Sequence, residues 1–235
     1  LILTAKQGIS YPKKILKKLS KIIKAEKPDL INTNNLAEFS VGIWKLIKKM
    51  QIPLVHTLRD FSLLCPRATL FRRNNICIKK NILCILMLKF KMLFSNYPDA
   101  VVGNSKFVLD LHVKSGFFTK PDKYIVYNSL ELDKIIPAIK NIKGIKFGYV
   151  GLLSYHKGTE FLLETFSQSE LKNFGGLYIF GKGITEEYEN YLKEKYHSEK
   201  ILFQGYKKPE DTFKLFNVLI VPSLCLDSLP RVIYE

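Results

Sequence analysis

Residues 146–168 read KFGYVGLLSYHKGTEFLLETFSQ, and this segment shows how the whole chain is built. The short apolar run KFGYVG is typical of a buried strand. The run TEFLLETFSQ places apolar residues at helical spacing, so it predicts an amphipathic helix. An apolar strand joined by a short loop to a helix is the unit from which parallel sheets are assembled.

The same unit recurs on both sides of this segment. Strands are expected at 29–35, 52–58, 99–105, 123–129, 146–151, 176–181, 201–205 and 218–223. Helices are expected at 11–29, 37–50, 81–96, 106–116, 159–168, 185–197 and 209–216, with another beginning at Leu229. The series is interrupted by a link near 134–145, which predicts two domains.

The expected fold is therefore α/β, with two Rossmann-like domains whose parallel sheets face a cleft. The first spans residues 1–138 and the second residues 139–235. The chain has no initiator Met, opens on the strand-like LILTA and stops shortly after a helix is expected to begin. We therefore expect a fragment truncated at both ends, without the first strand and loop of one domain and the C-terminal part of the other.

Charge is unevenly distributed along the chain, whose net charge is +16. Residues 1–140 contain 25 Lys and Arg against 9 Asp and Glu, whereas residues 141–235 contain 12 of each. A basic half beside a neutral half suggests two domains with different partners. Nucleic acid is not expected among them, because no helix-turn-helix, zinc-finger or RNP signature accompanies the lysines.

Two further features limit the class of protein. Four cysteines lack the paired spacing of a zinc site, so buried free thiols in a reducing cytoplasm are expected. The most apolar stretch, ILCILMLKFKMLF at 82–94, is too short to span a bilayer and is interrupted by two lysines. No signal peptide is visible at the start of the chain.

Ligands of open α/β sheets bind beyond the carboxyl ends of the strands. The expected strand ends lie in KPDLINTNNL, IPLVHTLRDFSLLCPR, DAVVGNSKFV, YNSLELD, VGLLSYHKG, IFGKG, FQGY and VPSLCLDSLPRVIYE. In order and spacing these segments resemble the family-4 glycosyltransferases of GT-B fold, which build cell-surface polysaccharides and glycolipids. The resemblance covers nearly the whole chain, and it rests on eight weak motifs in sequence.

The resemblance gives roles to the last segment. Asp227 and Glu235 match the spacing of the family's E-x7-E pattern, with Asp in the first place. It implies that Asp227 contacts the donor sugar and that Glu235 holds the ribose hydroxyls, as a carboxylate can do for a vicinal diol. The backbone of a helix start at Leu229, Pro230, Arg231 and Val232 would face the diphosphate. Without the resemblance, Asp227 reads as an N-cap and Glu235 as a solvated helix residue.

The resemblance also gives roles to the segments after two other strands. Lys157 matches the Lys of a G-R-L-x-x-x-K-G pattern that neutralises the leaving diphosphate, but Leu152 replaces its Arg. His156 or Arg231 could compensate, or turnover is lowered. The backbone of three glycines would approach the nucleotide, unless they are plain turn glycines: Gly151, Gly181 and Gly183.

In the first half, Arg59 and Asp60 stand where many relatives have His-Asp near the reacting sugar. Asp60 matches and Arg59 does not, so the acceptor side departs most from the family pattern. His56 reads more readily as a core histidine. Ser105 and Asn128 either line the cleft or cap and turn the chain.

The resemblance implies sugar transfer from a nucleotide diphosphate sugar to a hydroxyl acceptor, with retention of anomeric configuration. The expected enzyme is a metal-independent hexosyltransferase-type glycosyltransferase, without cofactor, in which fixed cations and helix amides stabilise the leaving group. A degenerate, non-catalytic relative that binds sugar nucleotides or partners is the alternative. A sugar-nucleotide epimerase of the same fold is a further one.

The basic first half is expected to meet the acceptor, a lipid-linked sugar or another saccharide. The lysine-coated helix at 11–29 and a loop containing Arg67, Arg72 and Arg73 could hold anionic lipid. The other reading is a solvated, lysine-rich face. The expected location is the cytoplasm. If the basic surface holds anionic lipid, the protein is expected to lie peripherally on the inner face of the cell membrane.

Overall fold

The computed structural model describes residues 13–36, 40–72, 74–77, 80–130 and 144–234. It divides into two compact units. The first comprises residues 1–70, 77–129 and 227–229, and the second comprises 71–76, 130–226 and 230–235. The predicted boundary between residues 138 and 139 lies outside the described residues, as does Glu235.

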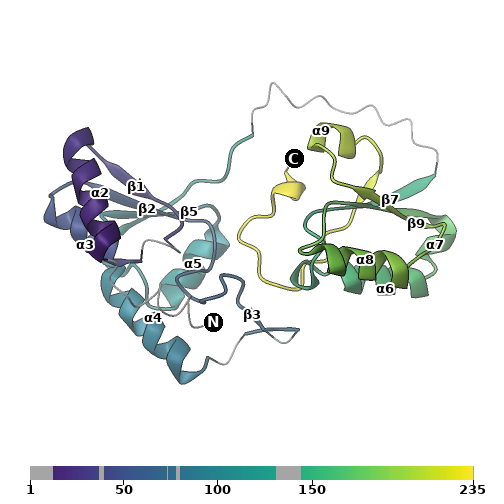
Figure 1. Cartoon of the computed structure of the whole chain (residues 1–235), viewed down its shortest axis with the longest axis horizontal. Coiled ribbons are helices and arrows are strands. Elements are labelled where there is room, and N and C mark those ends of the chain that lie inside the picture. Colours follow the sequence, from purple (N-terminus) through teal and green to yellow (C-terminus); the bar gives the residue numbers. More distant parts are fainter. Residues whose placement is uncertain (1–12, 37–39, 73, 78–79, 131–143, 235) are drawn as a thin grey trace. The chain divides into compact units, whose positions relative to one another are not determined.

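The first unit is built around a four-stranded sheet in the order β1-β2-β5-β6. Every neighbouring pair is parallel, and Val55 of β2, for example, lies opposite Ala100 of β5. The strands are β1 (Ile31–Thr33), β2 (Leu54–Leu58), β5 (Ala100–Gly103) and β6 (Asp122–Ile125). The helices are α2 (Lys13–Glu26), α3 (Gly42–Lys49), α4 (Ile82–Phe94) and α5 (Lys106–Lys114) (Figure 1). Strand and helix alternate as the apolar patterns predict.

A buried polar cluster lies in the core of the first unit. Trp44 donates its indole N–H to Thr33 Oγ1 at 3.1 Å, and the same hydroxyl lies 3.0 Å from Nδ1 of His56. The Trp44 side chain is fully buried, and only 3% of His56 is exposed. The interpretation of His56 as a core histidine is therefore confirmed.

The second unit contains a parallel sheet in the order β10-β7-β8-β9. Its strands are β7 (Ile145–Val150), β8 (Gly175–Phe180), β9 (Ile201–Gly205) and β10 (Val218–Leu219). Its helices are α6 (Thr159–Gln168), α7 (Leu171–Phe174), α8 (Glu186–Lys195) and α9 (Pro209–Thr212), with 3-10 turns η2 (Tyr155–Lys157) and η3 (Arg231–Ile233). Helix α6 has the predicted bounds, whereas α9 is shorter than expected.

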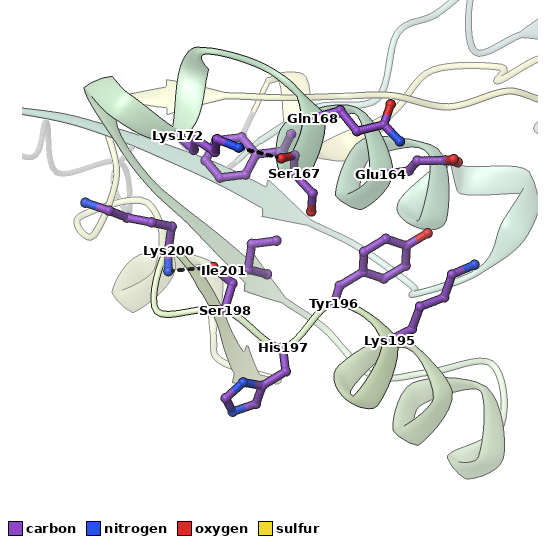
Figure 2. Close-up of a pocket in the computed structure, with 11 residues that line it drawn as sticks. Glu164, Ser167, Gln168, Lys172, Lys195, Tyr196, His197, Ser198, Lys200 and Ile201 are labelled. Carbon is purple, nitrogen blue, oxygen red and sulfur yellow. Dashed lines mark hydrogen bonds between the residues drawn. The ribbon is translucent and has the colours of Figure 1, made fainter.

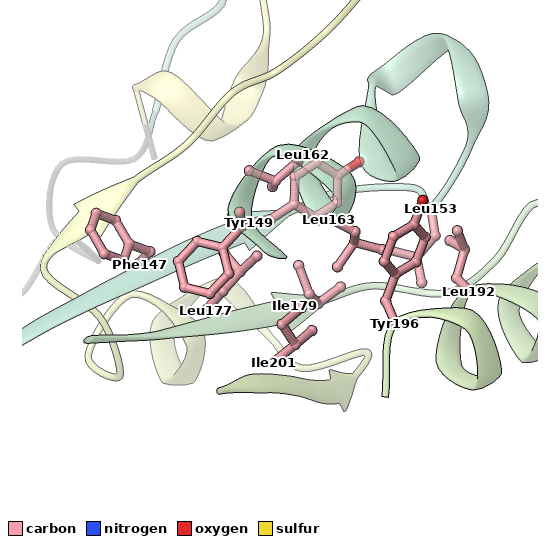
Figure 3. Close-up of a cluster of buried hydrophobic side chains, with 11 residues drawn as sticks. Phe147, Tyr149, Leu153, Leu162, Leu163, Leu177, Ile179, Leu192, Tyr196 and Ile201 are labelled. Atoms are coloured by element: carbon pink, nitrogen blue, oxygen red, sulfur yellow. The ribbon is translucent and has the colours of Figure 1, made fainter. Parts of the chain in front are cut away.

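Both faces of the second sheet are covered. Leu163 of α6 and Leu192 of α8 pack with strand residues such as Leu177 in one hydrophobic cluster (Figure 3). On the other face Phe216 follows α9 and lies against Gly148, where an added Cβ would come within 2.3 Å of the ring. The glycine therefore makes room for an aromatic side chain directly on the sheet.

Other local elements also differ from the sequence expectation. The segment 59–80 contains a small antiparallel hairpin, β3 (Phe71–Arg72) with β4 (Asn75–Ile76), where only a loop was expected. The prediction of a helix from Leu229 is wrong for the described residues, because they form a 3-10 turn at Arg231–Ile233 instead. Pro230 precedes that turn with an extended ψ of 116°, so helical geometry begins only after it.

None of the four cysteines forms a disulfide, and only Cys225 is buried, whereas buried thiols were expected throughout.

Candidate functional site

Three loops meet at the carboxyl edge of the second sheet. The loop after β7 pairs with the loop after β8, because Leu153 N–H donates to Lys182 O at 2.8 Å and Ile184 N–H donates to Leu153 O at 3.0 Å. The loop after β10 joins them through His156, whose carbonyl accepts N–H bonds from Leu224 at 3.0 Å and Cys225 at 3.1 Å. The structure thus brings together three of the segments in which the sequence predicted the donor site.

A buried hydroxyl network holds the first of these loops. Tyr149 at the end of β7 donates its hydroxyl to Leu152 O at 2.8 Å and accepts from Thr159 Oγ1 at 3.1 Å. Thr159 Oγ1 in turn accepts the amide of Ser154 at 3.2 Å. Burial raises the pKa of Tyr149 to about 12, so the hydroxyl remains a donor at any physiological pH. Sequence analysis overlooked Tyr149 and Thr159, because their positions read only as strand and helix residues.

Lys157 ends the turn η2, and its side chain is partly buried. The next residue, Gly158, has a φ of 72°, a region that favours glycine. A Cβ at Gly158 would lie 2.0 Å from the carbonyl oxygen of Pro222, so only glycine allows the loop after β10 to approach. Leu152, which replaces the family's Arg, is 44% exposed at the other end of this loop.

The predicted glycines have packing reasons of their own. A Cβ at Gly181 would lie 1.8 Å from Gly151 O, so the backbones of the two strand ends are in direct contact. The amide of Gly183 donates to Glu189 Oε2 at 2.7 Å. The ammonium of Lys193 lowers the pKa of the Glu189 carboxyl, and the bond from Gly183 lowers it further. Glu189 was not anticipated from the sequence, and a ligand role for the glycines stays a prediction.

The segment around Asp227 is shared between the two units. Asp227–Leu229 belongs to the first, and Pro230–Glu235 to the second. Within the first unit, Ser228 Oγ donates to Arg59 O at 2.7 Å, and Ser228 O accepts from Ser105 Oγ at 2.5 Å. The roles of Asp227, Arg231 and Val232 toward a donor stay predictions.

Strand ends of the first sheet hold two of the predicted polar residues. Asp60 accepts the amide of Ser62 at 2.7 Å and the side-chain amide of Asn35 at 3.1 Å. Ser105 caps α5 by accepting the amide of Val108 at 3.3 Å, which confirms the interpretation of Ser105 as a capping residue. Asn128 lies beyond the end of β6, outside regular structure.

Asn104 is the residue at this edge that sequence analysis missed. It is 4% exposed, and its Oδ1 has no hydrogen-bond partner within the described part of the chain. A buried carbonyl oxygen without a donor is costly, which makes Asn104 a candidate to contact a ligand hydroxyl.

A cavity of about 460 Å³ lies at the opposite, amino edge of the second sheet. It is lined where α6 and α8 end and β9 begins, and Lys172, Lys195 and Lys200 contribute to it (Figure 2). Lysines near helix C-termini offset the negative end of the dipole, and Lys195 also forms an ion pair with Glu160 at 2.9 Å. The cavity is therefore separate from the three loops that form the candidate donor site.

Comparisons with known proteins show which proteins the chain resembles. The family model described as Glycosyltransferase Family 4 matches residues 4–134. A protein of Klebsiella pneumoniae, named as an uncharacterized 42.6 kDa protein in a cps region, is 28% identical over 225 residues. That match covers 96% of this chain and 59% of the relative, so the chain spans less than two thirds of the relative's length.

Solved structures show the same fold at low identity. The lipopolysaccharide outer core galactosyltransferase WaaB in its apo form is 16% identical with a TM-score of 0.54, covering 88% of this chain and 54% of that one. TarM is 10% identical with a TM-score of 0.63, covering 92% and 41%. The pneumococcal O-GlcNAc transferase GtfA, in complex with UDP and GlcNAc, is 12% identical with a TM-score of 0.57, covering 91% and 41%. The chain therefore shares the GT-B α/β architecture of these enzymes.

Proposed function

Because the chain belongs to glycosyltransferase family 4, we propose that it transfers a sugar from a nucleotide diphosphate sugar to a hydroxyl group of a lipid-linked or saccharide acceptor. The product would be a cell-surface polysaccharide or glycolipid. The relative in a cps region supports that setting, and the UDP complex of GtfA makes uridine diphosphate sugars the first donors to test. The reaction is proposed to retain anomeric configuration without a metal ion.

The observation that carries this proposal is the meeting of the loops after β7, β8 and β10. Parallel sheets bind ligands at this edge, and Lys157 lies on one of the three loops. The ammonium of Lys157 would stabilise the negative charge on the leaving diphosphate. The carboxylate of Asp227, at the position where the family has a Glu, would contact the donor sugar. The leaving phosphate would accept the acceptor's proton, so no separate base is required.

A second candidate is a non-catalytic relative that binds sugar nucleotides. Leu152 favours it, because an isobutyl group in place of a guanidinium removes a bidentate phosphate contact. Both candidates bind a donor, but only the first produces a glycoside.

The test is a thermal-shift titration with UDP-, GDP-, dTDP- and ADP-sugars in EDTA, followed by NMR of the product's anomeric proton. A donor at one hundred times its dissociation constant should add about 2.7 kcal/mol of stability. Lys157→Ala should weaken the shift, whereas Lys200→Ala, an exposed lysine at the opposite edge, should leave it unchanged. Binding without any glycoside product would favour the non-catalytic candidate, and no binding by any sugar nucleotide would refute both.

A further inference from the structure

The carboxylate of Asp60 is held from two loops at the carboxyl edge of the first sheet. Its Oδ1 accepts the amide of Ser62 at 2.7 Å, and its Oδ2 accepts the side-chain amide of Asn35, from the loop after β1, at 3.1 Å. A carboxylate has about four acceptor sites, so these two bonds leave room for further donors. Asp60 is only partly buried, and a ligand hydroxyl can therefore reach it.

Helix α4 presents a charge to the interior of the first unit. It is almost entirely apolar, yet no helix in the described ranges is long and apolar enough to cross a membrane. Met87 is its buried residue, and Lys91 follows one turn later on the same face. The Lys91 ammonium donates to Ser62 O at 2.7 Å. Because removing a charge from water costs free energy, a lysine at this position needs a reason beyond filling space.

Ser62 joins the Lys91 ammonium to the Asp60 carboxylate. Its carbonyl accepts the bond from Lys91, and its amide donates to Asp60. Burial lowers the pKa of the Lys91 ammonium, whereas negative charge on Cys65 and on Asp60 acts in the opposite direction. Helix α4 has no acidic residue of its own, so the carboxylate that attracts Lys91 comes from the loop after β2.

The backbone on both sides of Ser62 is anchored. The ring of Phe61 is 2% exposed and stacks on His112 of α5, with ring centroids 6.3 Å apart and planes inclined by 11°. The carbonyl of Phe61 accepts the amides of Leu64 at 2.9 Å and Cys65 at 2.8 Å. The Lys91 bond holds the carbonyl of Ser62 between these neighbours, and it thereby helps to set the direction of the Ser62 amide.

The other predicted acceptor-side residue is placed differently. Arg59 is exposed, and its backbone carbonyl accepts Ser228 Oγ at 2.7 Å. Asp60, by contrast, is oriented through its side chain. Of the two residues that stand in the place of the family's His-Asp, Asp60 is therefore the one whose functional group is fixed by these bonds.

We propose that Lys91 is a positioning residue, which holds the Asp60 carboxylate through Ser62 in the direction where it accepts a hydrogen bond from the acceptor's hydroxyl group. Lys91 itself touches no substrate. Once a saccharide covers Asp60 and excludes water, the ammonium of Lys91 offsets the carboxylate charge more strongly than it would in water. The role in transfer rests on the proposed function, whereas the link between Lys91 and Asp60 does not.

The first test is acceptor kinetics on the full-length protein. The acceptors are octyl β-glucoside and octyl β-galactoside, and the donor is the sugar nucleotide selected by the thermal-shift titration. Lys91→Met keeps the length of the side chain and removes its charge, so it should raise the acceptor KM about ten-fold and leave the donor KM unchanged. Lys91→Arg should recover most of the loss. Lys89→Met, at an exposed lysine of the same helix, is the matched control and should behave as the parent does.

The second test separates positioning from a merely structural role. If Lys91 acts through Asp60, Lys91→Met should have no further effect on the acceptor KM in an Asp60→Asn background. A lysine that only stabilised α4 would lower the free energy of unfolding and change the kinetics equally in both backgrounds. Equal effects in both backgrounds, or an effect of Lys89→Met as large as that of Lys91→Met, would overturn the proposal.

Hydrogen exchange gives a readout that needs no substrate. The Ser62 amide should exchange about ten-fold faster in Lys91→Met and in Asp60→Asn, whereas sheet amides such as that of Val101 should keep the parent rate. Unchanged exchange at Ser62 in Lys91→Met would show that Lys91 does not hold Asp60. If the parent transfers no sugar to any acceptor but exchange at Ser62 still depends on Lys91, the proposed function fails and the link to Asp60 stands.

Discussion

The carbonyl oxygen of Pro222 occupies the space that a side chain at Gly158 would need, 2.0 Å from an ideal Cβ position. This contact joins the loop after β10 to the start of α6, and a positive φ of 72° at Gly158 makes it possible. The packing of the loop after β10 against the start of α6, both parts of the candidate donor site, therefore requires glycine at position 158.

Gly158→Ala should lower the free energy of unfolding by about 3 kcal/mol, since it adds a backbone clash to the cost of a left-handed residue. Gly205→Ala is the matched control, because Gly205 has a similar φ of 68° but nothing within 4 Å of an added Cβ. That variant should lose only about 1 kcal/mol. Urea unfolding of both variants measures the difference, and equal losses would show that the Pro222 contact has no energetic weight.

Two buried histidines should make the protein sensitive to mild acid. Burial, with the nearby charge of His112, lowers the pKa of His56 to about 3, and burial lowers that of His112 to about 4. The unfolded chain binds these protons near pH 6.5, so the stabilisation is fully present above that pH and is lost as the pH falls toward 4.

Each neutral histidine should contribute about 1.4 kcal/mol per pH unit to the slope of stability between pH 4 and 6.5. His112→Leu should remove one such contribution, measured as the free energy of urea unfolding at several pH values. His197→Ala, at an exposed position, should keep the parent slope. A parent protein with flat stability from pH 7 to 5 would contradict this prediction.

Leu152→Arg should restore the family's phosphate-binding cation. The Leu152 side chain is 44% exposed, and the contact that fixes this residue is its backbone carbonyl with Tyr149. We therefore expect no loss of stability, and a donor dissociation constant about ten-fold lower, as a charge-assisted hydrogen bond of about 1.5 kcal/mol would give. Isothermal titration with the donor checks this, and Leu152→Met is the neutral control. A gain in Leu152→Met as large as that in Leu152→Arg would argue against a role for charge.

Glu189→Ala should loosen the loop after β8, because the amide of Gly183 would lose its carboxylate partner. The expected loss is about 1.5 kcal/mol, together with weaker donor binding. Glu194→Ala, an exposed carboxylate on the same helix, should change neither quantity. Hydrogen exchange at the Gly183 amide would report the change directly, and unchanged protection would contradict the prediction.

The sequence predicted the regular elements well wherever the period was clear. Helix α6 begins at Thr159 and ends at Gln168 as expected, since its apolar positions repeat at helical spacing. The hairpin of β3 and β4 was missed, because strands of two residues are too short to show a period. The α-helix expected from Leu229 is replaced by a 3-10 turn after Pro230, where the apolar pattern could not distinguish the two.

The contacts that form the candidate site could be predicted only in part. The strand ends were located from the alternation of strands and helices. The bond from the Gly183 amide to Glu189 could not be located in this way, because it depends on how the loop after β8 folds back onto helix α8. The orientation of α4 was also beyond reach, because almost every position in 82–94 is apolar. An all-round apolar helix does not reveal which side faces outward, and here the lysine at 91 turns inward.

The strand order of the second sheet has a consequence for folding during synthesis. β7 is the first strand of that sheet to be made, yet one of its two neighbours is β10, about seventy residues later in the chain. The side chain of Asn217 bonds Lys146 N–H at 2.8 Å and Gly144 O at 2.9 Å, so it aligns the two strands where they meet. Until β10 leaves the ribosome, one edge of β7 stays unpaired, and pairing on that side waits until about seventy further residues have been translated.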